Sequence, residues 1–181
     1  YSIVVEDPNR NSGIENIPGS VDVPFCITSL LIIDAQAGHN DSPILLSPAI
    51  ENACINQRWE HNPGAFDADD DSLTYDLIAC AGFECLPIQG FVQPNEVEGA
   101  GGEFYVEPTT GTVVWDVPGM VGEFNMALRI REWREVEGQW VMVGEVIRDM
   151  QISVEGCPNE PPVVVVPPDT CIVQGANLTF E

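Results

Sequence analysis

The sequence contains two copies of one short pattern, separated by the length of a whole domain. The first copy runs from Asn40 to Pro48 and is followed by Cys54, and the second runs from Asn159 to Pro167 and is followed by Cys171. From position 40 to position 159 the offset is 119 residues, and from 54 to 171 it is 117. A period of this size indicates a domain-sized repeat rather than a short solenoid motif.

The segments that precede each copy also match, because both show a strand pattern, a turn, a second strand pattern and a linker. These paired patterns cover Tyr1 to Val5 with Phe25 to Asp34, and Phe124 to Ile130 with Ile147 to Glu155. The pattern therefore predicts three units: residues 1–39 as the C-terminal strands of one repeat, 40–158 as one complete repeat, and 159–181 as the N-terminal part of the next. A lone hairpin is marginal in water, so we expect residues 1–39 to be completed by further chain or by a neighbouring subunit.

Apolar residues alternate with polar residues in most segments, which is typical of half-buried strands. Phe124, Met126, Leu128 and Ile130 form one apolar face, and the turn at 135–139 predicts an antiparallel hairpin with the strand around Ile152. Further strands are expected at 73–77, 104–107, 112–117 and 163–166. With 16 Gly and 15 Pro between short strands, the sequence predicts an all-β fold, a two-sheet β-sandwich.

Charge excludes some classes of partner. The 181 residues contain 29 acidic and 6 basic residues, for a formal net charge of −23. Nucleic acid binding needs a basic surface that this chain lacks, and the same charge disfavours anionic membrane surfaces. The sequence also contains no run of about 18 apolar residues that could insert into a bilayer.

The densest chemical signal is the acidic segment at 65–75. If it is extended, Asp67, Asp69 and Asp71 project to one side, which would place three carboxylates around one hard cation. The alternative is an acidic turn that is only solvated.

Further oxygen ligands follow a strand of the first predicted unit and also lie at the two predicted repeat boundaries. Oxygen-rich ligand sets of this kind favour calcium over magnesium. The sequence therefore predicts calcium sites that stiffen the junctions, and their additional candidate ligands are Glu6, Asp7, Asn9, Asn11, Asn40, Asp41, Asn159 and Glu160.

Six cysteines without a C-x-x-C pair indicate disulfides and an oxidising, extracytoplasmic setting. One arrangement pairs Cys54 with Cys80 around the acidic turn and Cys85 with Cys157, which leaves Cys26 without a partner. Connectivity remains open at this point, and free core thiols are the alternative.

Several motifs resemble one family. They are the segments 62–75 (NPGAFDADDDSLTY), 107–115 (EPTTGTVVW) and 122–124 (GEF), together with 132–134 and 148–152. They are similar to the cadherin-like and immunoglobulin-like repeats of large Bacteroidetes surface proteins associated with gliding motility and type 9 secretion. The resemblance implies tandem sandwich repeats, with the Asp-x-Asp segment and the Asn-x-x-Pro junctions as calcium-binding elements.

Together these patterns predict a structural repeat of a long extracellular or cell-surface adhesin or filament, and not an enzyme. Its expected partners are neighbouring repeats or identical subunits, and surface glycans or other cells. Two alternatives stay open. Four Trp residues could form a sugar platform in a carbohydrate-binding module, and paired carboxylates could serve a secreted hydrolase.

Overall fold

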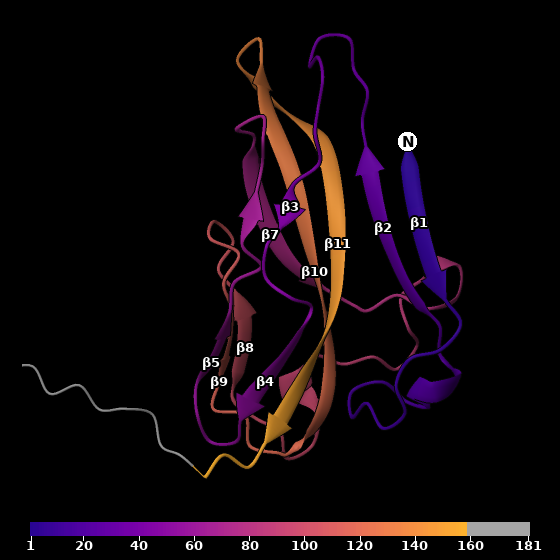
Figure 1. The fold of residues 1–181 in the computed structure, drawn as a ribbon, viewed down its shortest axis with the longest axis vertical. Coiled ribbons are helices and arrows are strands. Elements are labelled where there is room, and N and C mark those ends of the chain that lie inside the picture. Colours follow the sequence, from indigo (N-terminus) through magenta and orange to yellow (C-terminus); the bar gives the residue numbers. More distant parts are fainter. Residues whose placement is uncertain (159–181) are drawn as a thin grey trace, which may run out of the picture.

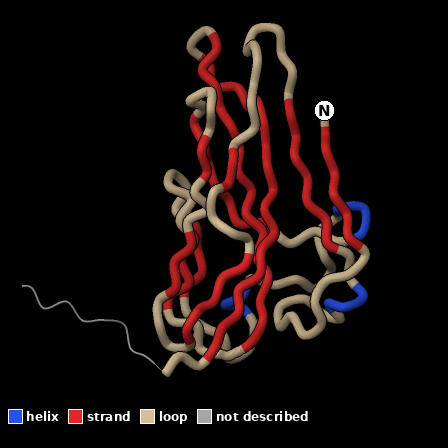
Figure 2. The backbone as a smooth tube through the Cα atoms, in the orientation of Figure 1, coloured by secondary structure: helices blue, strands red, loops and turns tan. Residues whose placement is uncertain are grey.

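The computed structural model describes residues 1–158, which form strands joined by turns and loops. The described helices are short 3-10 turns, drawn blue in Figure 2, at Ser20–Asp22, Phe83–Cys85 and Pro94–Glu96. The prediction of an all-β fold is confirmed. The predicted strand at 163–166 lies outside the described residues.

A six-stranded sheet forms the larger layer of the molecule (Figure 1). Its neighbouring strands follow the order β1-β2-β11-β10-β7, and β4 pairs with β11 in parallel. The strand bounds are β1 (Ser2–Asp7), β2 (Phe25–Leu31), β4 (Ile50–Cys54), β7 (Ser72–Ile78), β10 (Gly122–Val136) and β11 (Gln139–Glu155).

The hairpin of β10 and β11 is the longest element, and it confirms the predicted antiparallel pair. Its two-residue turn places Glu137 at φ 51° and Gly138 at φ 78°. Positive φ at both central positions gives the turn type whose twist matches the flanking strands. The turn sequence therefore sets the register of the hairpin as far as a bulge at Val143, where the pairing shifts by one residue between Glu132 and Trp133.

A smaller layer packs against the inner face of the hairpin. It contains the sheet β5-β9-β8, of β5 (Trp59–His61), β9 (Val113–Asp116) and β8 (Glu103–Val106), and the short pair β3 (Ile44–Leu45) and β6 (Ala65–Phe66). Trp115 is fully buried between the layers and meets Phe104 and Phe124 edge to face. The inward-facing residues of β10 from Phe124 to Ile130 are also fully buried. The described residues thus form a sandwich-like antiparallel fold.

The N-terminal hairpin belongs to the same sheet. β1 pairs with β2, and β2 pairs with β11 between Ser29–Leu31 and Gly144–Val146. This finding corrects the expectation that residues 1–39 need missing chain or another subunit, because β11 extends beyond β4 and offers β2 a free length of edge. The predicted unit 159–181 lies outside the described residues.

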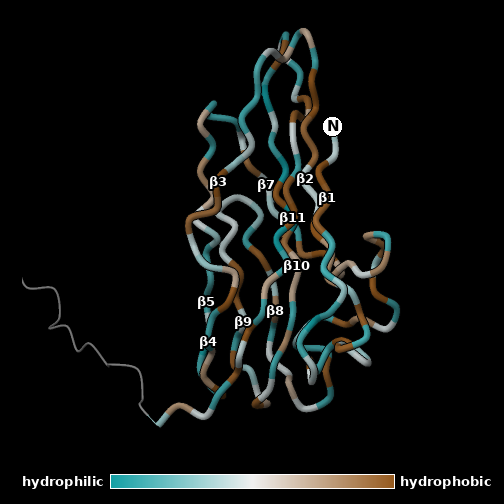
Figure 3. Tube along the Cα trace, turned by 45° about the vertical axis from the view of Figure 1, so that its right-hand side comes forward, coloured by the Kyte–Doolittle hydropathy of each residue, from teal (hydrophilic) through white to brown (hydrophobic). Residues whose placement is uncertain are grey.

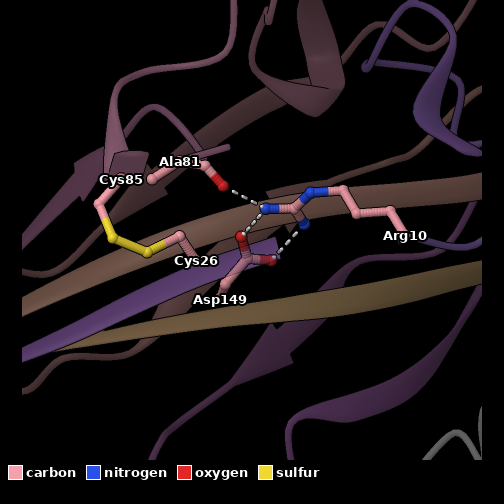
Figure 4. The surroundings of a disulfide bond; sticks show 5 residues. All are labelled: Arg10, Cys26, Ala81, Cys85 and Asp149. Carbon is pink, nitrogen blue, oxygen red and sulfur yellow. Dashed lines mark hydrogen bonds and ion pairs between the residues drawn. A yellow bond between two sulfur atoms is a disulfide. The ribbon is translucent and has the colours of Figure 1, made fainter. Parts of the chain in front are cut away.

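A buried polar network fastens the segment after β1 to the outer face of the sheet (Figure 4). Arg10 donates two hydrogen bonds to Asp149, at 3.0 and 2.6 Å, and a third to the Ala81 carbonyl. The side chains of Arg10 and Asp149 are 2% and 1% exposed, so each neutralises the other away from water. Asn125 also donates to Asp149.

The two disulfides of the described residues differ from the predicted pairs. Cys54 bonds to Cys157, because β4 and β11 run in parallel and bring the two Cα atoms to 5.4 Å. Cys26 bonds to Cys85 with Cα atoms 5.2 Å apart. The predicted pairs Cys54 with Cys80 and Cys85 with Cys157 are therefore wrong. Cys80 is a free, buried thiol, and its burial together with Asp149 raises its pKa well above the usual value.

Candidate metal centre

The turn between β6 and β7 gathers three carboxylates. Oδ1 of Asp67 accepts hydrogen bonds from the backbone N–H groups of Asp69 and Asp71, both at 3.0 Å. Asp70 reaches φ 61°, a left-handed conformation that Asp tolerates better than most residues. Ligand oxygens of Asp67, Asp69 and Asp71 lie within 4.8 Å of one another. They come together in a turn rather than along an extended strand, which corrects the predicted local geometry.

The connection between β2 and β3 brings the predicted ligand Asp41 to this turn. The backbone N–H of Asp41 donates to Oδ2 of Asp69 at 2.6 Å. This bond lowers the pKa of Asp69, with further help from the charge of Arg134, so Asp69 stays ionised. His39, Asp41 and Asp69 form a second group of potential ligand atoms within 4.8 Å, and all three residues are exposed.

Glu132 supplies a fourth carboxylate from the middle of β10. It is fully buried, and Asn40 donates a 2.6 Å hydrogen bond to its Oε2. Burial raises the pKa of Glu132 to about 7, and the negative charges of Asp67 and Asp71 act in the same direction. Gly144 on β11 makes room for this carboxylate, because a Cβ there would overlap its oxygens.

Two buried carboxylate oxygens of this cluster have no hydrogen-bond partner among the described residues. They are Oδ2 of Asp67, a residue only 6% exposed, and Oε1 of Glu132. A buried acceptor without a partner is costly, and a buried unpaired charge costs more. A cation bound by Asp67, Asp69 and Asp71 would satisfy the Asp67 oxygen. Glu132 belongs to neither of the groups of ligand atoms that lie within 4.8 Å of one another, although the charges of Asp67 and Asp71 act on it.

Arg134 is the positive group closest to these acids. It bonds both oxygens of Asp71, at 2.7 and 2.6 Å, and lies 3.3 Å from Oδ2 of Asp69. The hydrogen bonds to Asp71 raise the pKa of Arg134, which stays charged. Arg134 also donates to the Ala37 and His39 carbonyls and to Oδ1 of Asn40, so it ties the β2–β3 connection to the acidic turn.

The other predicted ligands do not join this centre. Asp7 accepts the backbone N–H of Asn9 at 3.2 Å, and the Asn9 amide donates to the Val21 carbonyl. The Asn11 amide donates to Gln151, and Glu6 and Asp7 belong to neither of the groups of potential ligands found among the described residues. Asn159 and Glu160 lie outside the described residues.

Glu132 is the site residue that the sequence reasoning missed. A signal was present, since Glu132 continues the inward-facing series of Phe124, Met126, Leu128 and Ile130 at the same period of two. A carboxylate at an inward position of a sandwich strand indicates either a buried ion pair or a cation.

Comparisons with known proteins add no relative. No family model, no curated protein and no solved structure matches this chain. Among the described residues, no helix has the length and apolar character needed to cross a membrane. The two disulfides indicate an oxidising, extracytoplasmic setting.

Proposed function

We propose that this chain is a structural unit of a large extracellular or cell-surface protein, an adhesin or a filament, which calcium and disulfides stiffen. Asp67, Asp69 and Asp71 form the calcium centre, and we place Glu132 and Asn40 in its ligand set because a cation there would meet the Glu132 oxygen that has no partner among the described residues. Asp41 belongs to its outer edge, because its backbone N–H holds Asp69.

The observation that carries this proposal is the imbalance of charge around Arg134. Asp67, Asp69, Asp71 and Glu132 bring four negative charges when ionised, and Arg134 brings one positive charge, so three negative charges remain uncompensated. The structure keeps Asp67 and Glu132 out of water, which makes this excess costly. A divalent cation would reduce the excess to a single charge and would coordinate the two unpartnered oxygens.

Calcium suits this donor set best. The donors are four carboxylates and the amide of Asn40, and calcium takes six to eight oxygen ligands in flexible geometry. Zinc favours the nitrogen and sulfur of His and Cys, which do not line the buried part of the cluster. Magnesium demands a stricter octahedron and keeps several waters.

The mechanical role follows from where these ligands come from. Asn40 lies in the connection that leads from the N-terminal hairpin, Asp67 to Asp71 form the β6–β7 turn, and Glu132 lies on β10. A cation held by all three would fix the connection against the sandwich. Because the N-terminal hairpin pairs with β11 in the main sheet, calcium there would stiffen the attachment of this hairpin within one structural unit.

The resemblance to cadherin-like and immunoglobulin-like repeats of Bacteroidetes surface proteins fits this proposal. Layered sheets, two disulfides and an acidic centre support it. Within the proposal, the partners are neighbouring repeats or identical subunits, and the ligands of the assembled array are surface glycans or other cells.

The positions of the tryptophans favour a structural role over a sugar platform. Trp115 is fully buried, Trp59 is 6% exposed, and the indole of Trp133 donates to Thr74. Trp140 is 61% exposed near the tip of the β10–β11 hairpin. A single exposed indole does not make the flat surface on which several sugar rings could stack.

Calcium is expected to stabilise the protein. At a free calcium concentration 100 times its Kd, the free energy of unfolding should rise by about 2.7 kcal/mol, because calcium binds the folded state alone. Thermal melting with calcium and with chelator, combined with titration calorimetry, measures this shift.

Asp67→Asn is the informative variant, because it keeps the Oδ1 that accepts two backbone N–H groups and removes the charge. This variant should lose most of the stabilisation that calcium gives to the wild-type protein. Asp34→Asn is the matched control, since Asp34 caps an exposed turn in the same way, through Gln36 and Ala37. If wild-type protein shows no heat of calcium binding and no shift in melting temperature, the calcium proposal is wrong.

A further inference from the structure

The outer edge of β1 is an open interaction surface. β1 is the edge strand of the six-stranded sheet, and among the described residues only β2 pairs with it. All six of its residues are exposed, and Ile3, Val4 and Val5 are 65%, 54% and 53% exposed. Figure 3 shows this strand largely in the brown of hydrophobic residues. A long apolar edge without charges or proline in its centre favours pairing with another strand.

The hydrogen bonds to β2 establish which backbone groups point outward. Tyr1 and Leu31 exchange two hydrogen bonds, at 2.7 and 2.8 Å, so they form a hydrogen-bonded pair. Such pairs alternate along an antiparallel ladder, so Ile3 and Val5 also bond to β2. The backbone N–H and C=O groups of Ser2, Val4 and Glu6 therefore face away from β2, toward the free edge.

We propose that two copies of this chain associate through their β1 strands, antiparallel, with Val4 on the two-fold axis. In this register Val4 faces Val4 of the second copy in a hydrogen-bonded pair, and Ser2 faces Glu6. Ile3 lies opposite Val5 in the two flanking pairs, where side chains are closest. The interface is self-complementary, as a two-fold dimer requires.

Charge disfavours the registers on one side of the proposed one. The proposed register places apolar residues opposite apolar residues and sets Glu6 opposite a hydroxyl. Moving the second strand by two residues in one direction puts Asp7 opposite Ile3, and a shift of four puts Glu6 opposite Glu6. Like charges in directly opposed positions destabilise a sheet. A shift of two in the other direction pairs Ile3 with Ile3 and Ser2 with Val4, and the cross-linking experiment below distinguishes it from the proposed register. We therefore favour a second copy of this chain over an unrelated strand as the partner, because two paired β1 strands place apolar side chains opposite apolar side chains.

The net charge opposes this association and makes its strength depend on salt concentration. Each copy carries a formal charge of −23, so two copies repel each other at low ionic strength. At 0.1 M salt, exposed charges more than about 10 Å apart are largely screened from each other. The dimer should therefore become tighter as salt is added. Since calcium has no part in the interface, the experiments are run with chelator, which separates them from the calcium proposal.

Cross-linking of single-cysteine variants tests the register. Val4→Cys should form a covalent dimer under a mild oxidant, because opposed residues of a hydrogen-bonded pair have Cα atoms about 5.5 Å apart, within the range of a disulfide. Ser2→Cys and Glu6→Cys should each stay monomeric alone but should cross-link when mixed. Among the described residues the thiol outside the two disulfides is Cys80, which is buried. Cys171 lies outside the described residues, so the variants are made in a Cys171→Ser background, and this protein without a further change gives the background of cross-linking. Cross-linking of Ser2→Cys alone would overturn the register, and so would its absence in Val4→Cys.

Sedimentation equilibrium tests the association itself. Wild-type protein should dimerise with rising concentration, and more strongly in 0.5 M than in 0.05 M NaCl. Val4→Pro should stay monomeric, because proline removes the outward N–H on the axis and is tolerated at an edge position that faces solvent. Val4→Ala keeps that N–H and should still dimerise. A wild-type protein that stays monomeric throughout, or association that Val4→Pro leaves unchanged, would overturn the proposal.

Discussion

Replacement of both Cys54 and Cys157 by alanine is expected to lower the free energy of unfolding by about 4 to 5 kcal/mol. The bridge joins residues separated by 103 positions, so it restrains most of the described chain in the unfolded state. It also closes the end of the sheet where β4 runs parallel to β11 and pairs as far as Glu155. This loss is a large share of the stability of an ordinary domain.

Urea unfolding of the double variant against the wild type measures this loss. The variant retains Cys26 and Cys85, whose bridge spans 59 positions, so its fold should persist at low temperature. Wild-type protein treated with reductant should lose at least as much stability as the variant. If the two proteins unfold at the same urea concentration, the bridge does not contribute as the structure indicates.

Glu132 should make the metal-free protein less stable as the pH rises. Its pKa is about 7 in the folded state, above the ordinary value of 4.5, because burial disfavours the charged form. Between these values the unfolded chain has released the proton and the folded chain retains it. Stability therefore falls with increasing pH, by about 3 kcal/mol in total, and the loss is complete above pH 7.

Glu132→Gln removes this proton equilibrium and the charge. In chelator at pH 8, the variant should be more stable than the wild type by up to about 3 kcal/mol, and the difference should vanish near pH 4.5. In calcium the order should reverse, because the variant has lost a ligand. Glu135→Gln, an exposed glutamate on the same strand, is the control and should show neither effect. A difference between wild type and Glu132→Gln that is independent of pH would contradict the role of this carboxylate.

Local patterns predicted the strands and one of the turns well. The alternation of Phe124 to Ile130 and the turn at Glu137 and Gly138 specify the β10–β11 hairpin, because both depend on residues that are neighbours in the chain. The acidic turn was also visible as a potential cation site, with Asp67, Asp69 and Asp71. Its contact with Asp41 was predicted only as a general accumulation of ligands at a boundary.

The sequence did not predict which distant strands and cysteines pair with each other. The bridge from Cys54 to Cys157 depends on β4 lying beside β11. The position of residues 1–31 depends on β2 pairing with Gly144–Val146 of the same strand. Nothing in the residues near either cysteine indicates which distant strand becomes its neighbour.

The sequence alone determined the all-β class, the hairpin and the acidic segment, since period-two alternation and turn residues act over a few neighbouring positions. Only the tertiary structure decided the cysteine pairs, the union of the N-terminal hairpin with the main sheet, and the burial of Glu132 beside Asp67. The physical reason is that folding brings together residues as much as 140 positions apart, as with Asn11 and Gln151, and burial then decides which charged groups are removed from water.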